Sequence, residues 1–163
     1  KQITAEACIH HLWFSDEDYE EKGTFIKWNP AVKTAQDREK IFEAVLDDRI
    51  DVIATDHAPH TLEEKNNKYD SAPSGGPLLQ HALLAIKERG FIREGYYADL
   101  VLIDAAQPWK VNRENILSKC AWSPFEGTTF RARISHTFVN GQIAYENGKV
   151  NDNIRGKRLE FDR

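Results

Sequence analysis

The chain has 163 residues, of which 40% are apolar and 29% are charged, with a formal net charge of −4 and a pI near 5.9. This length suits about one soluble globular domain, and the acidic balance excludes a protein whose main task is to hold nucleic acid or an anionic membrane. Two cysteines, Cys8 and Cys120, exclude a disulfide scaffold and a cysteine-built zinc site, and no stretch approaches the length of a membrane span, so we expect a cytoplasmic protein.

The first part of the chain predicts short elements. Alternating β-branched and small apolar residues over 3–9 favour a strand, and the acidic run over 15–22 is typical of a solvated loop or a short helix. Residues 24–28 favour an extended segment. It should end at Asn29-Pro30, because the residue before a proline is pushed out of the helical region.

A helix followed by a core strand comes next. Thr34 and, three residues later, Asp37 form a capping-box pattern, so a helix should begin near Ala35 and end around residues 47–48. The Val- and Ile-rich run over 50–55 then predicts a core strand. A helix joined by a short connection to such a strand is half of a βαβ unit, which indicates an α/β fold.

The stretch 61–76 is polar and long for a connection, and long ordered loops beside a strand end are often functional. Residues 77–85 predict another helix, because Pro77 suits a first helical turn.

The second half of the chain has the pattern of a β structure. Residues 98–104 predict a strand, and residues 134–139 and 142–145 predict a hairpin around Asn140-Gly141. Several short strands without intervening helices indicate a separate module, so we place a boundary near residues 88–92. The predicted domains are residues 1–90 and 91–163.

The strand over 50–55 ends in side chains that could carry chemistry. In barrels of alternating strands and helices, residues just past the C-terminal end of a strand form the active site. Asp56 has this position, followed by His57 and His60, and a carboxylate with imidazoles suits a divalent metal. The alternatives are a turn residue for Asp56, a structural ring for His57, and either a substrate contact or a surface residue for His60.

The other histidines are weaker candidates. Adjacent residues on a strand point to opposite faces, so at most one of His10 and His11 should face a site. His81 and His136 are expected to be structural or solvent-facing.

Several local patterns together resemble the C-terminal portion of dihydroorotases, in the cyclic amidohydrolase superfamily. They are Ile53–Thr61, Lys27–Pro30, Thr4–Glu6 with His10–Leu12, Ala98–Val101 and Trp122–Gly127. The resemblance covers nearly the whole chain. It implies the last strands and helices of a (β/α)8 TIM-type metallo-dependent hydrolase barrel, followed by a small β module that flanks it.

The resemblance also implies roles for individual residues. The Asp that matches Asp56 ligates one of two zinc ions and serves as general base and acid, whereas His10 and His11 have no ligand role. Asn29, His60, Ser74 and Gly75 match residues that contact the substrate, dihydroorotate. Zn²⁺ is therefore the expected cofactor and a small molecule the expected partner, with no nucleic acid and no membrane, while a homo-oligomer is left open.

The remaining metal ligands of that family lie upstream of this chain, and relatives carry additional residues near Ala85-Ile86, so we expect a fragment that is inactive alone. The implied activity of the whole protein is the reversible hydrolysis of L-dihydroorotate to N-carbamoyl-L-aspartate in pyrimidine biosynthesis. The alternatives are an allantoinase or dihydropyrimidinase type of cyclic amidohydrolase, and a catalytically inactive dihydroorotase-like scaffold subunit.

Overall fold

The computed structural model describes residues 3–85 and 98–157, and the chain divides into two compact units. The first unit contains Lys1–Lys87 and Val111–Thr128, and the second contains Glu88–Lys110 and Thr129–Arg163. The return of Val111–Thr128 to the first unit was not predicted. The predicted boundary at 88–92 falls on residues outside those described and stays a prediction.

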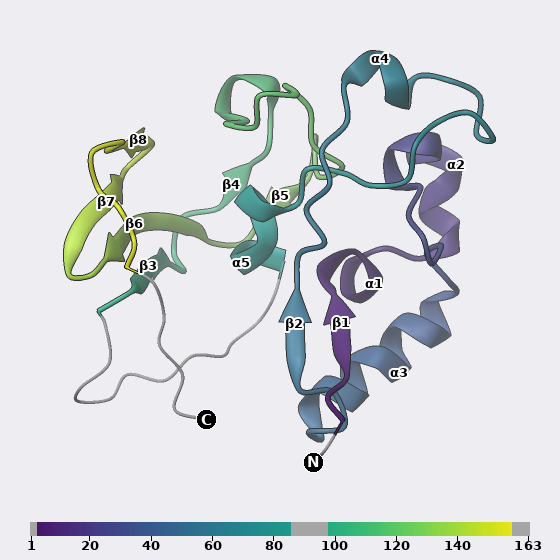
Figure 1. The fold of residues 1–163 in the computed structure, drawn as a ribbon, viewed down its shortest axis with the longest axis horizontal. Coiled ribbons are helices and arrows are strands. Elements are labelled where there is room, and N and C mark those ends of the chain that lie inside the picture. The colour runs from purple at the N-terminus through teal and green to yellow at the C-terminus, as the bar shows by residue number, and fades with distance from the viewer. Residues whose placement is uncertain (1–2, 86–97, 158–163) are drawn as a thin grey trace. The chain divides into compact units, whose positions relative to one another are not determined.

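Two parallel strands organise the first unit (Figure 1). Strand β1 (Glu6–Cys8) pairs in parallel with β2 (Val52–Ala54), so that Cys8 lies opposite Ala54. Helix α1 (Ile9–Trp13) follows β1 directly and contacts α3 (Ala35–Leu46), the helix that leads into β2. Because the strands are parallel and in register, the residues that follow both strands emerge at the same edge.

The remaining helical elements of this unit are short. They are η1 (Asp16–Asp18), α2 (Tyr19–Lys22), η2 (Gly23–Ile26), α4 (Leu62–Lys65), η3 (Leu79–His81), α5 (Ala82–Ala85) and η4 (Arg113–Asn115). The acidic run, predicted to be a solvated loop or a short helix, contains η1 and α2, and the helix predicted from Pro77 begins two residues later.

One local prediction is wrong. Residues 24–28 were expected to be extended, but Gly23–Ile26 form a 3-10 turn. The Thr24 hydroxyl donates to the carbonyl of Lys65, and the side chains of Ile26 and Trp28 are buried. These tertiary contacts decide the conformation against the extended preference of the β-branched and aromatic residues.

The predicted start of α3 is confirmed in detail. The Asp37 amide donates to the Thr34 hydroxyl at 3.2 Å, and the Thr34 amide donates to the Asp37 carboxylate at 3.1 Å. Both arms of the capping box are therefore closed, which fixes the helix start and, through it, the approach of the chain to β2.

The core of the first unit is aromatic. The rings of Phe14 and Phe125 stack with centroids 5.3 Å apart, and Phe14 also stacks on Trp28 at 5.9 Å. Trp122 and Phe125, from the segment 111–128, are fully buried. Large buried rings contribute much of the apolar area removed from water, so they explain why this segment joins the first unit.

The second unit is built on antiparallel strands. Its main sheet has the order β3-β6-β7-β8, formed by β3 (Leu100–Asp104), β6 (Arg133–Val139), β7 (Gln142–Glu146) and β8 (Lys149–Val150). Strands β4 (Trp109–Lys110) and β5 (Thr129–Phe130) form a separate pair. The predicted hairpin is confirmed, because Asn140 and Gly141 both have positive φ, as a type I′ turn requires.

Within the described residues, no helix has the length and apolar character needed to cross a membrane.

His81 gives a testable consequence of the first unit's packing. Its ring is buried, its Nδ1 lies 3.1 Å from the Ser123 hydroxyl, and burial lowers its pKa from 6.5 to about 4. Below pH 6.5 the unfolded chain takes up a proton that the folded protein excludes. Stability should therefore fall as the pH drops from 6.5 towards 4, by up to about 1.4 kcal/mol per pH unit from this residue.

The measurement is denaturant unfolding at pH 7, 6 and 5 for the wild type and for His81→Gln. The replacement lowers stability at every pH, but it should remove this part of the pH slope. Equal slopes in the two proteins would contradict the assignment.

Candidate active site

Asp56 lies just past the C-terminal end of β2. It is exposed and has a φ of 46°, in the left-handed region that Asp and Asn tolerate better than most residues. Burial raises the pKa of the Cys8 thiol, and the negative charges of Asp56 and then Glu6 add to this shift. The Asp56 carboxylate is therefore close to the end of β1, as the parallel register of β1 and β2 requires.

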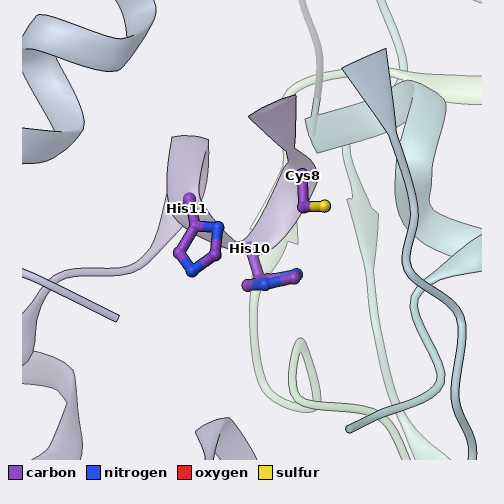
Figure 2. Close-up of side chains that lie close together, drawn as sticks. All are labelled: Cys8, His10 and His11. Atoms are coloured by element: carbon purple, nitrogen blue, oxygen red, sulfur yellow. The ribbon is translucent and has the colours of Figure 1, made fainter. Parts of the chain in front are cut away.

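Cys8, His10 and His11 bring three potential metal donors together at this edge. One ligand atom from each lies within 4.8 Å of the others, and the two imidazole centroids are 4.1 Å apart. Figure 2 shows Cys8 at the end of β1 and both rings on the turn that follows. The expectation that only one histidine could face a site is wrong, because the pair lies in helix α1 and not in a strand.

His10 is the member of this cluster best suited to a metal. Its ring is buried and stacks on the indole of Trp28 with centroids 4.4 Å apart. Burial, followed by the neighbouring His11, lowers the pKa of His10 to about 3. The ring is thus neutral at physiological pH, which is the form that ligates metals. Its Nδ1 is buried and has no hydrogen-bond partner among the described residues.

The donor set at this edge therefore fits a divalent metal such as zinc, which accepts nitrogen, sulfur and oxygen ligands. His10 and Asp56 are the stronger candidates, because Cys8 has a raised pKa that favours the protonated thiol and His11 has another partner. From the sequence, His10 was expected to have no ligand role. Its position just after β1, which pairs in parallel with β2, makes it a candidate in the structure.

The second group of predicted residues, His60, Ser74 and Gly75, is also brought together. The Nε2–H of His60 donates to the carbonyl oxygen of Ser74 at 3.0 Å. Since a carbonyl can only accept, this contact places the proton on Nε2. Nδ1 lies 3.9 Å from the nearer carboxylate oxygen of Glu64, which is beyond hydrogen-bond distance, so Nδ1 is the ring atom that can meet a ligand.

Gly75 packs against the segment that carries Asp56 and His60. It has a φ of 123°, and a Cβ placed on it would lie 2.6 Å from the carbonyl oxygen of Ala58. No other residue can have this conformation so close to a neighbouring backbone. The close approach holds the Ser74–Gly75 backbone beside His60.

The residues on either side of Asn29 contact the histidine cluster. It is exposed, and it follows Trp28, which stacks on His10. The next carbonyl, that of Pro30, accepts a hydrogen bond from His11 Nε2 at 3.1 Å. The two groups are connected through the backbone, because the Gly75 amide donates to the Lys27 carbonyl at 2.9 Å.

His57 has a structural role, as the sequence suggested. Its Nδ1 accepts hydrogen bonds from the amides of Leu78 at 3.1 Å and Leu79 at 3.2 Å. These are the amides at the start of η3, which have no partner within the helix. His57 therefore fixes the end of the loop.

No protein-family model matches the chain. Among proteins of known identity, it is 35% identical to a dihydroorotase of Clostridioides difficile and 36% identical to one of Clostridium acetobutylicum, each over 88% of its length. It is 34% identical to a dihydroorotase of Bacillus subtilis over 91% of its length. The chain spans only 40%, 41% and 41% of these relatives.

Solved structures show the same fold. The chain matches an L-hydantoinase (dihydropyrimidinase) from Arthrobacter aurescens with a TM-score of 0.82 at 22% identity, covering 91% of this chain and 40% of that one. It matches a D-hydantoinase with a TM-score of 0.78 at 18% identity, covering 90% and 40%. The predicted α/β fold class, part of a (β/α)8 barrel with a small β module, is confirmed.

Proposed function

We propose that this chain, which corresponds in sequence to about two fifths of a dihydroorotase, is the C-terminal part of a metal-dependent enzyme of that kind. The enzyme would interconvert L-dihydroorotate and N-carbamoyl-L-aspartate in the cytoplasm, as a step of pyrimidine biosynthesis. The carrying observation is the register of β1 and β2, which puts Asp56 and His10 at one edge. A carboxylate and a neutral imidazole at one edge of a parallel sheet suit a hydrolytic metal centre.

Asp56 and His10 would hold the metal, which we take to be zinc within a binuclear site whose other ligands come from the rest of the protein. When bound, the metal supplies Lewis acidity that activates water and polarises the ring amide. Asp56 accepts a proton from the attacking water and returns it to the departing amide nitrogen. Its exposed position at the strand end leaves the carboxylate accessible to substrate.

The other residues bind and orient the substrate. Dihydroorotate carries a carboxylate and ring amide groups, which need hydrogen-bond donors and acceptors. The Nδ1 of His60 and the exposed amide of Asn29 can supply them, and the backbone of Ser74 and Gly75 adds contacts that do not depend on a side chain. This set recognises a small, anionic cyclic amide.

A substrate comparison with the intact protein tests this function. We expect kcat/KM for L-dihydroorotate to exceed the values for allantoin and dihydrouracil by about 10²-fold or more, because the wrong ring leaves hydrogen-bonding groups of the closed site without partners. Metal analysis should find about two zinc ions per chain. A preference for dihydrouracil or allantoin would indicate the related amidohydrolases, and a protein without metal or turnover would indicate a scaffold subunit.

A further inference from the structure

Lys65 is the most unusual charged residue of the first unit. It ends helix α4, and its side chain is fully buried. Transfer of an ammonium group out of water is costly unless its donors are satisfied. Within residues 3–85 and 98–157, Lys65 has no carboxylate partner. Its position therefore needs another explanation than an ion pair.

Backbone carbonyls satisfy the ammonium group instead. Nζ of Lys65 donates to the carbonyl oxygen of Pro73 at 2.9 Å and to that of Gly75 at 2.8 Å. The group also lies 5.8 Å from the ring centroid of Trp122, within the range of a cation–π contact. Burial, with a smaller effect of Lys27, lowers the pKa of Lys65 to about 8, so the amine remains protonated at neutral pH.

The two carbonyls lie on either side of Ser74. The carbonyl of Ser74 itself accepts the Nε2–H of His60 at 3.0 Å. One ammonium group thus fixes the carbonyl groups of the residues before and after Ser74, the residue that orients the His60 ring. Through these contacts Lys65 acts on three of the residues proposed to bind substrate, without reaching the substrate itself.

We propose that Lys65 is a positioning residue for substrate binding: its buried ammonium holds the carbonyls of Pro73 and Gly75 and so sets the Ser74–Gly75 backbone and the His60 ring. This inference rests on the proposed function, because it takes these residues as the substrate contacts. No sequence pattern in this chain indicates such a role for Lys65.

The chain offers a matched control. Lys27 also donates to two carbonyls of the same loop, those of Tyr69 at 2.6 Å and Ala72 at 2.7 Å. These carbonyls do not flank Ser74. Replacement of the Lys27 side chain also leaves its backbone carbonyl in place to bind the Gly75 amide. Lys27→Met therefore removes an equivalent pair of hydrogen bonds without freeing the peptide groups around Ser74.

The experiment compares Lys65→Met and Lys27→Met in the intact protein, with L-dihydroorotate as substrate. Lys65→Met should raise KM by about tenfold or more, because two hydrogen bonds to a charged group are lost at the binding loop. It should leave kcat within about threefold and the metal content unchanged. Lys27→Met should change KM by less than about threefold. Equal KM changes in the two variants, or an unchanged KM in Lys65→Met, would overturn the proposal.

A second variant and a second readout keep the test decisive. If Lys65→Met does not fold, Lys65→Gln retains a donor and should give a smaller rise in KM in the same direction. Long-range ¹H–¹⁵N NMR of His60 should show the Nε2–H tautomer in the wild type and its loss of preference in the Lys65 variant. A wild type that does not hydrolyse dihydroorotate refutes the proposed function. With an active wild type, the positioning role is refuted if Lys65→Met leaves KM unchanged, and also if it leaves the His60 tautomer unchanged.

Discussion

Replacement of Asp56 by Asn is expected to lower kcat of the intact protein by about 10³-fold or more, without loss of the fold. In the proposed function, Asn removes the group that accepts and returns the proton, an effect of about 10²–10⁴-fold by itself, and it also weakens a metal ligand. The fold should survive, because Asp56 is exposed and its φ of 46° lies in a region that Asn tolerates well.

The control for this variant is Asp48→Asn. Asp48 is another aspartate with positive φ, at 62°, and it lies after α3, at the opposite end of β2 from Asp56. The same chemical change there should leave kcat and the metal content as in the wild type. Steady-state kinetics and metal analysis on both variants make the comparison. A fully active Asp56→Asn enzyme would remove Asp56 from the reaction.

Gly75→Ala should be the most damaging small change in the binding loop. The new methyl group would meet the Ala58 carbonyl oxygen at 2.6 Å and the Ala58 Cβ at 2.9 Å, and the φ of 123° is strained for any L side chain. Overpacking against backbone typically costs 1–3 kcal/mol. We therefore expect a loss of about 2 kcal/mol or more in unfolding free energy and a rise in KM.

Gly127→Ala separates the effect of backbone strain from the effect of the steric clash. Gly127 also has a positive φ, at 87°, but a Cβ at this position meets no atom within 4 Å. It should show the conformational strain without the steric clash and without a change in KM. Denaturant unfolding and steady-state kinetics on the pair measure the difference. If Gly75→Ala were no more harmful than Gly127→Ala, the close packing of the loop on Ala58 would be wrong.

Local patterns predicted the elements whose determinants are close in sequence. The capping box of Thr34 and Asp37 gave the start of α3, and Asn140-Gly141 gave the hairpin, because in both cases the stabilising contacts lie within a few residues. The extended prediction for 24–28 failed because Thr24 is bound by Lys65, far along the chain.

The candidate site residues also divide into those that the sequence predicts and those that only the fold brings into view. The strand-end rule identified Asp56 from sequence, and the resemblance added Asn29, His60, Ser74 and Gly75 as proposed contacts. The sequence predicts no ligand role for His10, because its place at the same sheet edge as Asp56 follows from a parallel pairing between residues more than forty positions apart. The role of Lys65 cannot be predicted from the sequence, because a lysine in an acidic, polar stretch normally faces solvent. Only the fold shows its buried contacts.

The loop over residues 72–76 combines buried positions, where substitutions should be poorly tolerated, with one exposed position, Ser74, where they should be tolerated. Ala72, Gly75 and Gly76 are buried, whereas Ser74 presents its side chain to solvent and contributes to the His60 contact only through its carbonyl. A library that seeks to change the proposed substrate preference should therefore diversify Ser74 and keep its neighbours. New side chains at Ser74 would alter the chemistry presented to the ligand while the scaffold beneath it stays intact.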